Sequence, residues 1–203
     1  MENELIQRTA KVLTRKINCY TCKDGLELQK MELGMEILLI NVSKIIIIYL
    51  LAILLGILGQ TLIIHGAFML TKRYSFGLHA LNSTVCTVLS CCMFVFIPLL
   101  LSDMGISNPI VLTVFPVIIS ILYRYAPADT KARPIIGVKL RKQLKYKSIA
   151  FSTIAMAIAL IVPNESLKLL MVLGAAYQSI SILPITYKIL KRSEKNYEMY
   201  ECA

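Results

Sequence analysis

Ionisable side chains are scarce inside the long apolar runs of this 203-residue chain, and the sequence contains no Trp. A transporter that moves charge through a membrane needs paired ionisable residues within its spans. Only Lys44 and Lys168 come near such positions, and both lie close to the ends of apolar runs, where a long side chain can reach the interface. The sequence therefore offers little support for a transport pathway.

The positions of the cysteines also predict neither a disulfide framework nor a metal site. Most of the six Cys lie in or beside apolar runs, whereas disulfide scaffolds are typical of small secreted domains. Cys19 and Cys22 have metal-like spacing, but no second pair completes four zinc ligands. We expect no metal and no other cofactor. We also expect no cleavable signal peptide, because residues 1–33 contain no short apolar core followed by small residues.

Hydrophobic runs dominate what is present. Hydrophobic residues make up 57% of the chain and the mean hydropathy is +0.68, against roughly 45–50% apolar residues in a soluble domain. A membrane core of about 30 Å is crossed by about 20 helical residues, so several runs are long enough to span it. The sequence predicts an all-α, polytopic membrane helix bundle. The runs cover residues 37–70, 80–101, 109–123, 148–162 and 167–190.

Positive charge is unevenly distributed between the loops. The net charge is +10, yet residues 102–108 carry only Asp103 and residues 163–166 carry only Glu165. Cytoplasmic loops of membrane proteins are enriched in Lys and Arg. We therefore expect a multi-pass protein of the cell membrane with both termini in the cytoplasm. The basic residues of the expected cytoplasmic segments include Arg8, Lys11, Arg15, Lys16, Lys72, Arg73, Arg124, Lys131, Arg133, Lys139, Arg141, Lys142, Lys145, Lys147, Lys188 and Lys191.

The number of crossings depends on the run 37–70. If Lys72 and Arg73 are cytoplasmic, this run must cross twice, and Gly56 together with Gly59 offers a turn near its middle. That arrangement gives six membrane-embedded helices. The alternative is four crossings, with part of the run re-entrant or interfacial.

The N-terminal segment, residues 1–36, is predicted to form an amphipathic surface helix followed by the start of a second helix after Asp24 and Gly25. A basic amphipathic helix lies on an anionic leaflet, so membrane lipids are expected partners. The alternative is a solvated terminus. Apolar residues recur at helical spacing at Ile6, Ala10, Leu13 and Ile17. The predicted organisation is a surface segment at 1–36, a membrane domain at 37–190 and a cytoplasmic tail at 191–203.

The strongest candidate for chemistry is the pair His79 and Cys86, at the point where a basic loop enters an apolar run. A cysteine nucleophile needs a base such as imidazole within about 3 Å. On one continuous helix the pair would lie about 10 Å apart, so a helix must begin between them. Asn82 or Ser83 can cap such a helix, and Cys86 would then lie in its first turn, where free N–H groups favour a thiolate.

A structural interpretation competes with this one. A Cys in an apolar run is usually a small buried hydrophobe, and a lone His near an interface is often a polar anchor. Cys91 and Cys92 lie deeper in the same run and fit that description, as does His65. The basic cluster 139–147 is explained most simply as a topology anchor, although it could also bind lipid phosphates or an acidic peptide.

The stretch Arg73-Tyr-Ser-Phe-Gly77-Leu-His79-Ala to Cys86 resembles the accessory gene regulator B (AgrB) family, membrane endopeptidases that process quorum-sensing propeptides in Gram-positive bacteria. Two further segments support the resemblance: Leu33-Gly-Met-Glu36 before the first span, and Tyr125-Ala-Pro-Ala-Asp-Thr followed by Pro134-Ile in the basic loop. The length and hydropathy pattern agree over nearly the whole chain.

The resemblance implies roles for individual residues. His79 and Cys86 correspond to the catalytic pair, and Arg73 and Gly77 to functionally important positions before it. Glu36 is a supporting residue, whose equivalent is Gln in some relatives. Phe76 departs from the family, which often has a small residue there. Asp129 is left out of the catalytic set, because relatives do not uniformly carry an acid at that position.

The resemblance also implies the reaction. The expected enzyme is a cysteine endopeptidase that cleaves the C-terminal tail of an AgrD-like propeptide through an acyl-enzyme thioester. It would promote cyclisation of the signal to a thiolactone or lactone. It would act as a homodimer, and no nucleic-acid partner is expected. The alternative functions are a non-catalytic peptide exporter and a membrane scaffold.

Overall fold

The computed structural model describes residues 2–77, 83–130, 134–190, 193 and 196–201. In this part of the chain the structure is helical, and its one strand-like feature is an isolated bridge between Phe76 and Ala128. The predicted all-α class is therefore confirmed. The chain forms two compact units, Met1–Leu51 and Ala52–Ala203.

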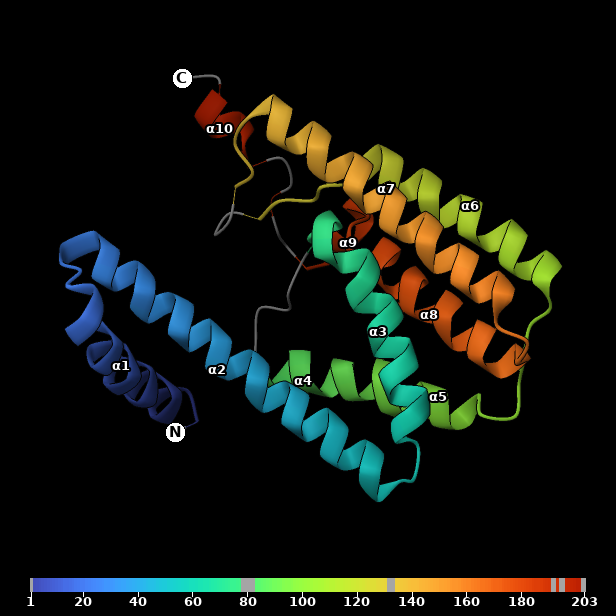
Figure 1. Ribbon diagram of the computed structural model, residues 1–203. Helices are drawn as coiled ribbons and strands as arrows, with labels where there is room; N and C mark the ends of the chain where they lie inside the picture. Colours follow the sequence, from blue (N-terminus) through green and yellow to red (C-terminus); the bar gives the residue numbers. More distant parts are fainter. Residues whose placement is uncertain (1, 78–82, 131–133, 191–192, 194–195, 202–203) are drawn as a thin grey trace. The chain divides into compact units, whose positions relative to one another are not determined.

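The helices follow one another with short connections, in the order drawn in Figure 1. They are α1 (Glu2–Thr21), α2 (Gly25–Leu54), α3 (Leu58–Ser75), α4 (Ser83–Cys91), a π-helix η1 (Cys92–Phe96), α5 (Ile97–Leu100), α6 (Asn108–Tyr125), α7 (Val138–Ile161), α8 (Glu165–Ser181), α9 (Pro184–Ile189) and α10 (Glu198–Glu201).

The first unit consists of α1 and most of α2. The two helices are separated by a break at residues 22–24, close to the predicted helix end at Asp24. On α1, Ala10 and Thr14 lie one turn apart and are buried. The Gln7 side chain donates a hydrogen bond to Glu36 Oε1 of α2 at 3.3 Å. The amphipathic, membrane-surface role of α1 stays a prediction.

The end of α2 confirms the predicted turn at Gly56. The N–H of Ile57 donates to Ala52 O at 2.9 Å, and the N–H of Gly56 donates to Ile53 O at 3.1 Å. These two bonds form a Schellman motif, which requires a left-handed residue after the helix, and Gly56 has φ +70°. Leu54 therefore ends α2, and α3 begins at Leu58.

The second unit is built around a bundle of α3, α6, α7 and α8, in which α3 packs against α8 and α7, and α6 packs against α7 and α8 (Figure 1). One stripe of α6 is buried at intervals of three and four residues. Small residues on the facing helices let the backbones approach closely. The stripe consists of Val111, Phe115, Ile118 and Leu122, and the small residues include Ala67, Ala155, Ala159, Gly174 and Ala175.

A widened turn interrupts the helix that carries Cys86. Pro98 has no N–H, and its ring conflicts with the carbonyl of Phe94 four residues earlier. The chain responds with the π-helix η1, in which the N–H of Ile97 bonds to Cys92 O. Phe94 O is instead satisfied by the buried Thr61 hydroxyl of α3 at 2.9 Å.

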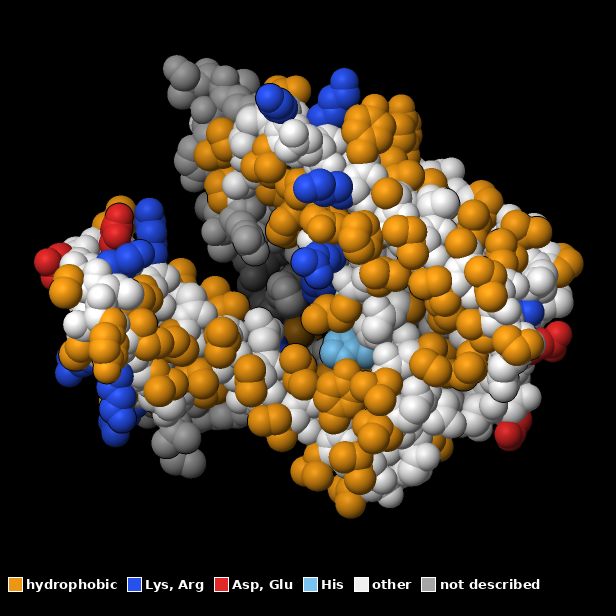
Figure 2. Space-filling model, viewed as in Figure 1, with side chains coloured by type: hydrophobic (Ala, Val, Ile, Leu, Met, Phe, Trp, Pro, Cys, Tyr) orange, Lys and Arg blue, Asp and Glu red, His pale blue; other side chains and the backbone are white. Residues whose placement is uncertain are grey.

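Three described helices are long and apolar enough to cross a membrane, namely α2, α6 and α7. Many large hydrophobic side chains are exposed on them, and Figure 2 shows hydrophobic side chains spread over the surface in view. This agrees with a membrane protein, because soluble monomers rarely expose such extended apolar surface. The predicted count of six crossings is not confirmed: the described residues 84–100 form a shorter apolar segment, and the run 167–190 is broken between α8 and α9.

Candidate functional site

Cys86 lies in the first turn of α4, which begins at Ser83. Cys86 is partly exposed, and its backbone carbonyl accepts a hydrogen bond from the Ser90 hydroxyl at 2.8 Å. The helix start between residues 79 and 86 is the feature that the sequence argument required. The first-turn N–H groups of an α-helix have no intrahelical acceptor, so they favour negative charge at this position.

His79 lies outside the described residues, as does Asn82, one of the two expected capping residues. The described chain ends at Gly77 on one side of this segment and resumes at Ser83 on the other. The structure therefore describes the residues on either side of the segment that contains His79.

The end before His79 is held in a polar junction, which we define as Ser75, Phe76, Gly77, Ala128 and Gln178. The N–H of Ala128 donates to Ser75 O at 2.9 Å, and the N–H of Gly77 donates to Ala128 O at 3.1 Å. The buried Gln178 amide of α8 donates to Ser75 Oγ at 2.7 Å and also to Phe76 O. The three segments that meet in this junction, 75–77, Ala128 and Gln178, come from different parts of the chain.

Gly77 is required by the shape of this junction. Its φ of +117° is rarely adopted by residues with a side chain. A Cβ placed there would lie 2.9 Å from Ser181 Oγ and 3.1 Å from Ile182 Cγ2. Phe76, the residue that departs from the family pattern, also has positive φ, at +57°.

Asp129 follows Ala128 of the polar junction and joins this part of the chain to its C-terminal region. It is buried, and its two carboxylate oxygens accept hydrogen bonds from the backbone N–H groups of Asn196 and Tyr197, at 3.1 and 2.9 Å. Its carbonyl accepts a bond from the Tyr187 hydroxyl at 2.8 Å. These contacts give Asp129 a structural role.

The remaining predicted site residues are Arg73 and Glu36. Arg73 is exposed in the last turn of α3, with its guanidinium carbon 5.8 Å from the Tyr74 ring centre. Glu36 belongs to the first unit, where it accepts the bond from Gln7. The structure thus places Gly77 in the polar junction and Arg73 in the helical turn before it, and it describes Glu36 in a different unit from Cys86.

The residues interpreted as structural from the sequence are His65, Cys91 and Cys92, and they differ in burial. His65 is buried, with its ring centre 4.8 Å from that of Phe94. Cys91 is buried at the end of α4, and Cys92 is exposed on η1.

Comparison with known proteins decides the family. The family model described as Accessory gene regulator B matches residues 6–182, which include both ends of the His79 segment and Cys86. The chain belongs to the AgrB family. An AgrB-like protein of Clostridium acetobutylicum is 41% identical over 200 residues, covering 98% of this chain and 96% of the relative. An AgrB-like protein of Listeria innocua is 42% identical over 197 residues, covering 97% and 96%.

The accessory gene regulator protein B of Staphylococcus aureus is 37% identical over 164 residues, which cover 81% of this chain and 87% of that protein. No solved structure matches the chain. Membership of the AgrB family confirms the resemblance inferred from the sequence and connects the chain with accessory gene regulation.

The sequence did not predict the side-chain contacts that hold the polar junction and the neighbouring Asp129 in this AgrB-family protein. Gln178 and Ser75 are 103 positions apart, and Tyr187 and Asp129 are 58 apart. The one local signal was an amide inside an apolar run: a buried polar side chain in a membrane helix needs a hydrogen-bonding partner. That signal marks Gln178 as unusual but cannot name its partner.

Proposed function

We propose that this AgrB-family protein is a membrane-embedded cysteine endopeptidase. It removes the C-terminal tail of an AgrD-like quorum-sensing propeptide and promotes closure of the remaining signal into a thiolactone or lactone ring. It works in the cell membrane as a multi-pass homodimer with both termini in the cytoplasm. The observation that carries the proposal is the position of Cys86, a partly exposed thiol in the first turn of a helix that starts shortly after His79 in the chain.

The first half of the reaction forms an acyl-enzyme. His79 takes the proton of the Cys86 thiol, and the thiolate attacks the carbonyl that joins signal to tail. First-turn N–H groups of α4 stabilise the developing negative charge. The peptide C–N bond breaks as a thioester bond to Cys86 forms, and the imidazolium of His79 returns its proton to the amine of the departing tail.

The second half transfers the acyl group within the bound peptide. A Cys or Ser side chain of the signal attacks the thioester carbonyl, which forms the ring bond and releases Cys86. Exchange of one thioester for another conserves the energy that a thiolactone requires. Exclusion of water from the apolar boundary around α4 favours ring closure over hydrolysis.

The anchoring of Gly77 supports this mechanism. A base must be held near its nucleophile, and a loop fixed at both ends loses less freedom on reaching that geometry. The polar junction holds Gly77 just before the His79 segment, and α4 begins just after this segment in the chain. Arg73 and Glu36 are proposed to contact the propeptide or support the loop.

Co-expression with an AgrD-like propeptide tests the proposal, with the masses of the fragments measured by mass spectrometry. Cys86→Ala and His79→Ala should each reduce cleavage by at least about a thousandfold, because each removes one member of the reacting pair. Cys92→Ala is the matched control: its thiol is exposed six positions along the same segment, and it should cleave like the wild type.

Undiminished cleavage by Cys86→Ala at normal membrane levels would overturn the mechanism and favour an exporter or scaffold, neither of which needs a thiol at this position. A linear signal as the sole product of fully active protein would overturn the ring-closing half alone.

A further inference from the structure

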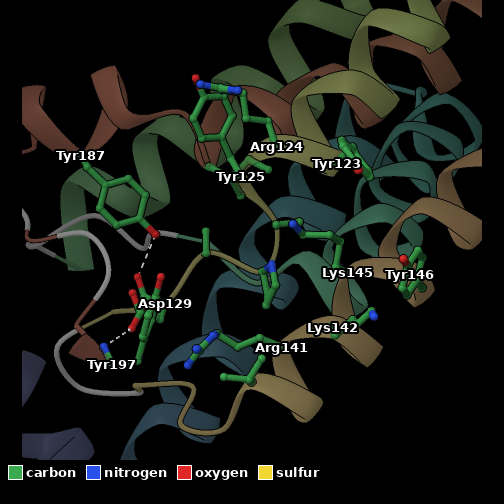
Figure 3. Close-up of a pocket in the computed structure, with 15 residues that line it drawn as sticks. Tyr123, Arg124, Tyr125, Asp129, Arg141, Lys142, Lys145, Tyr146, Tyr187 and Tyr197 are labelled. Carbon is green, nitrogen blue, oxygen red and sulfur yellow. Dashed lines mark hydrogen bonds between the residues drawn. The ribbon is translucent and has the colours of Figure 1, made fainter. Parts of the chain in front are cut away.

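A basic, aromatic cavity lies where α6 ends and α7 begins, and the proposed peptidase reaction does not use it. Its volume is about 430 Å³. Figure 3 shows the residues that line it. Arg124 comes from the last turn of α6, while Arg141, Lys142 and Lys145 come from the first turns of α7. The backbone adds to this positive potential, because the cavity is also lined by Val138 at the N-terminus of α7.

Basic side chains outnumber acidic ones among the described residues that line this cavity. Four are basic, and Asp129 is the one carboxylate. That carboxylate accepts the backbone N–H groups of Asn196 and Tyr197. An anionic ligand would balance the excess of positive charge.

Aromatic rings hold two of the basic side chains in place. The guanidinium carbon of Arg141 lies 3.8 Å from the Tyr197 ring centre, and the same side chain donates to Ile135 O at 3.2 Å. Lys145 Nζ lies 5.4 Å from the ring centre of Tyr123. Such cation–π contacts reduce the freedom that a flexible basic side chain would lose on binding an anion.

The position of the cavity along α6 and α7 indicates what kind of anion it fits. Both α6 and α7 are candidate membrane spans, and the cavity lies where each changes from apolar to basic sequence. A second hollow shares Tyr123, Arg124 and Lys145 with the first. It continues one helical turn toward the apolar parts of both helices, to Ile119 on α6 and Ile149 on α7.

We propose that these two hollows form a binding site for one anionic phospholipid. Arg124, Lys142 and Lys145 contact the phosphate, and the start of an acyl chain follows Ile119 and Ile149. Basic pockets between membrane helices are suited to anionic headgroups. A free phosphate or an acidic peptide would use the charges but not the apolar continuation, so a lipid fits both hollows best.

Native mass spectrometry of the purified full-length protein in an equal mixture of phosphatidylglycerol and phosphatidylcholine tests the site. We expect the wild type to retain phosphatidylglycerol preferentially. Arg124→Gln combined with Lys145→Gln should lower that preference by at least about tenfold, because two headgroup contacts are lost. Lys139→Gln combined with Lys147→Gln removes the same charge from residues that do not line either hollow, and should keep the preference.

Equal losses in the two double variants would overturn the site, since net charge alone would explain them. If the first double variant does not fold, Lys142→Gln replaces it: this side chain is exposed and lines only the first hollow, and its loss should still lower the preference. An unchanged preference in that variant would count against the site.

Competitors separate the sources of negative charge. Glycerol phosphate, which has the headgroup chemistry without acyl chains, should displace the lipid only at far higher concentration. Displacement at matched concentration would overturn the role of the apolar hollow. Displacement by a Glu-rich peptide, with glycerol phosphate ineffective, would assign the cavity to a peptide instead. None of these readouts requires peptidase activity, so the proposal stands or falls independently of the proposed function.

Discussion

Gly77 is the last described residue before the segment that contains His79, and its φ of +117° is one that residues with a side chain rarely adopt. Gly77→Ala adds a Cβ at φ +117° and places it against Ser181 Oγ. We expect a loss of about 1–3 kcal/mol in stability from backbone strain alone, together with a large loss of propeptide cleavage. Thermal unfolding in detergent and the co-expression assay measure the two effects.

Gly137→Ala provides the matched control. Gly137 also has positive φ, at +101°, but an added Cβ would meet no atom within 4 Å. Its substitution should cost similar stability and leave cleavage nearly unchanged. Ser181→Ala in the Gly77→Ala background should restore part of the activity, because the closest clash is removed. Equal cleavage by the two glycine variants would contradict a specific role for the junction.

At the scale of elements, the packing of α3 on α8 depends on Gly174. An added Cβ there would meet Ile64 O and would lie 2.9 Å from Ala67 Cβ. Gly174→Ala should therefore destabilise the protein by about 1–3 kcal/mol, because neither backbone can move independently of its helix. A lowered midpoint of thermal unfolding in detergent is the expected result.

Gly66 on the facing helix makes the opposite prediction. It is exposed, and nothing lies within 4 Å of an added Cβ. Gly66→Ala should raise stability by up to about 1 kcal/mol, since alanine favours a helix over glycine. If both alanine variants shift the midpoint in the same direction, close packing between α3 and α8 does not explain the role of Gly174.

Element boundaries were predictable where a local signal fixes them. Gly56 ends α2 through a glycine-dependent cap, and Ser83 begins α4 where the sequence offered a capping residue. The disturbed turn inside the run 80–101 was not predicted, although Pro98 carried the information for it. Its form as a π-helix, with Phe94 O accepting from Thr61, depended on a neighbouring helix.

At the scale of the whole molecule, the uneven charge of the loops predicts orientation. The two loops with little charge, residues 102–108 and 163–166, contact each other in the structure. The N–H of Ile106 donates a hydrogen bond to Glu165 O at 3.2 Å. We expect Asp103→Cys and Pro163→Cys, in a background without native Cys, to react with an impermeant maleimide in intact cells. Lys188→Cys should react only after permeabilisation. Labelling of all three in intact cells would contradict the proposed topology.

The same assay counts the crossings. Leu55→Cys, in the turn between α2 and α3, should also react in intact cells if this region crosses the membrane twice. Protection of this position, with Asp103→Cys still labelled, would favour the four-crossing alternative. The physical basis is that a re-entrant turn stays within the membrane, where an impermeant reagent cannot reach it.

The sequence by itself determined the helical class, the apolar runs, the turn at Gly56, the helix start before Cys86 and the family motif, because each depends on residues close together in the chain. It could not determine that Gln178 would join Ser75, or that Asp129 would receive Tyr187 and the backbone of residues 196 and 197. The first pairing arises only when α3 and α8 pack, and the others only when α9 and the residues after it reach Asp129. A buried polar group takes whichever partner the fold brings within hydrogen-bonding distance. The anchoring of the loop beside the proposed catalytic pair was therefore decided by the tertiary structure.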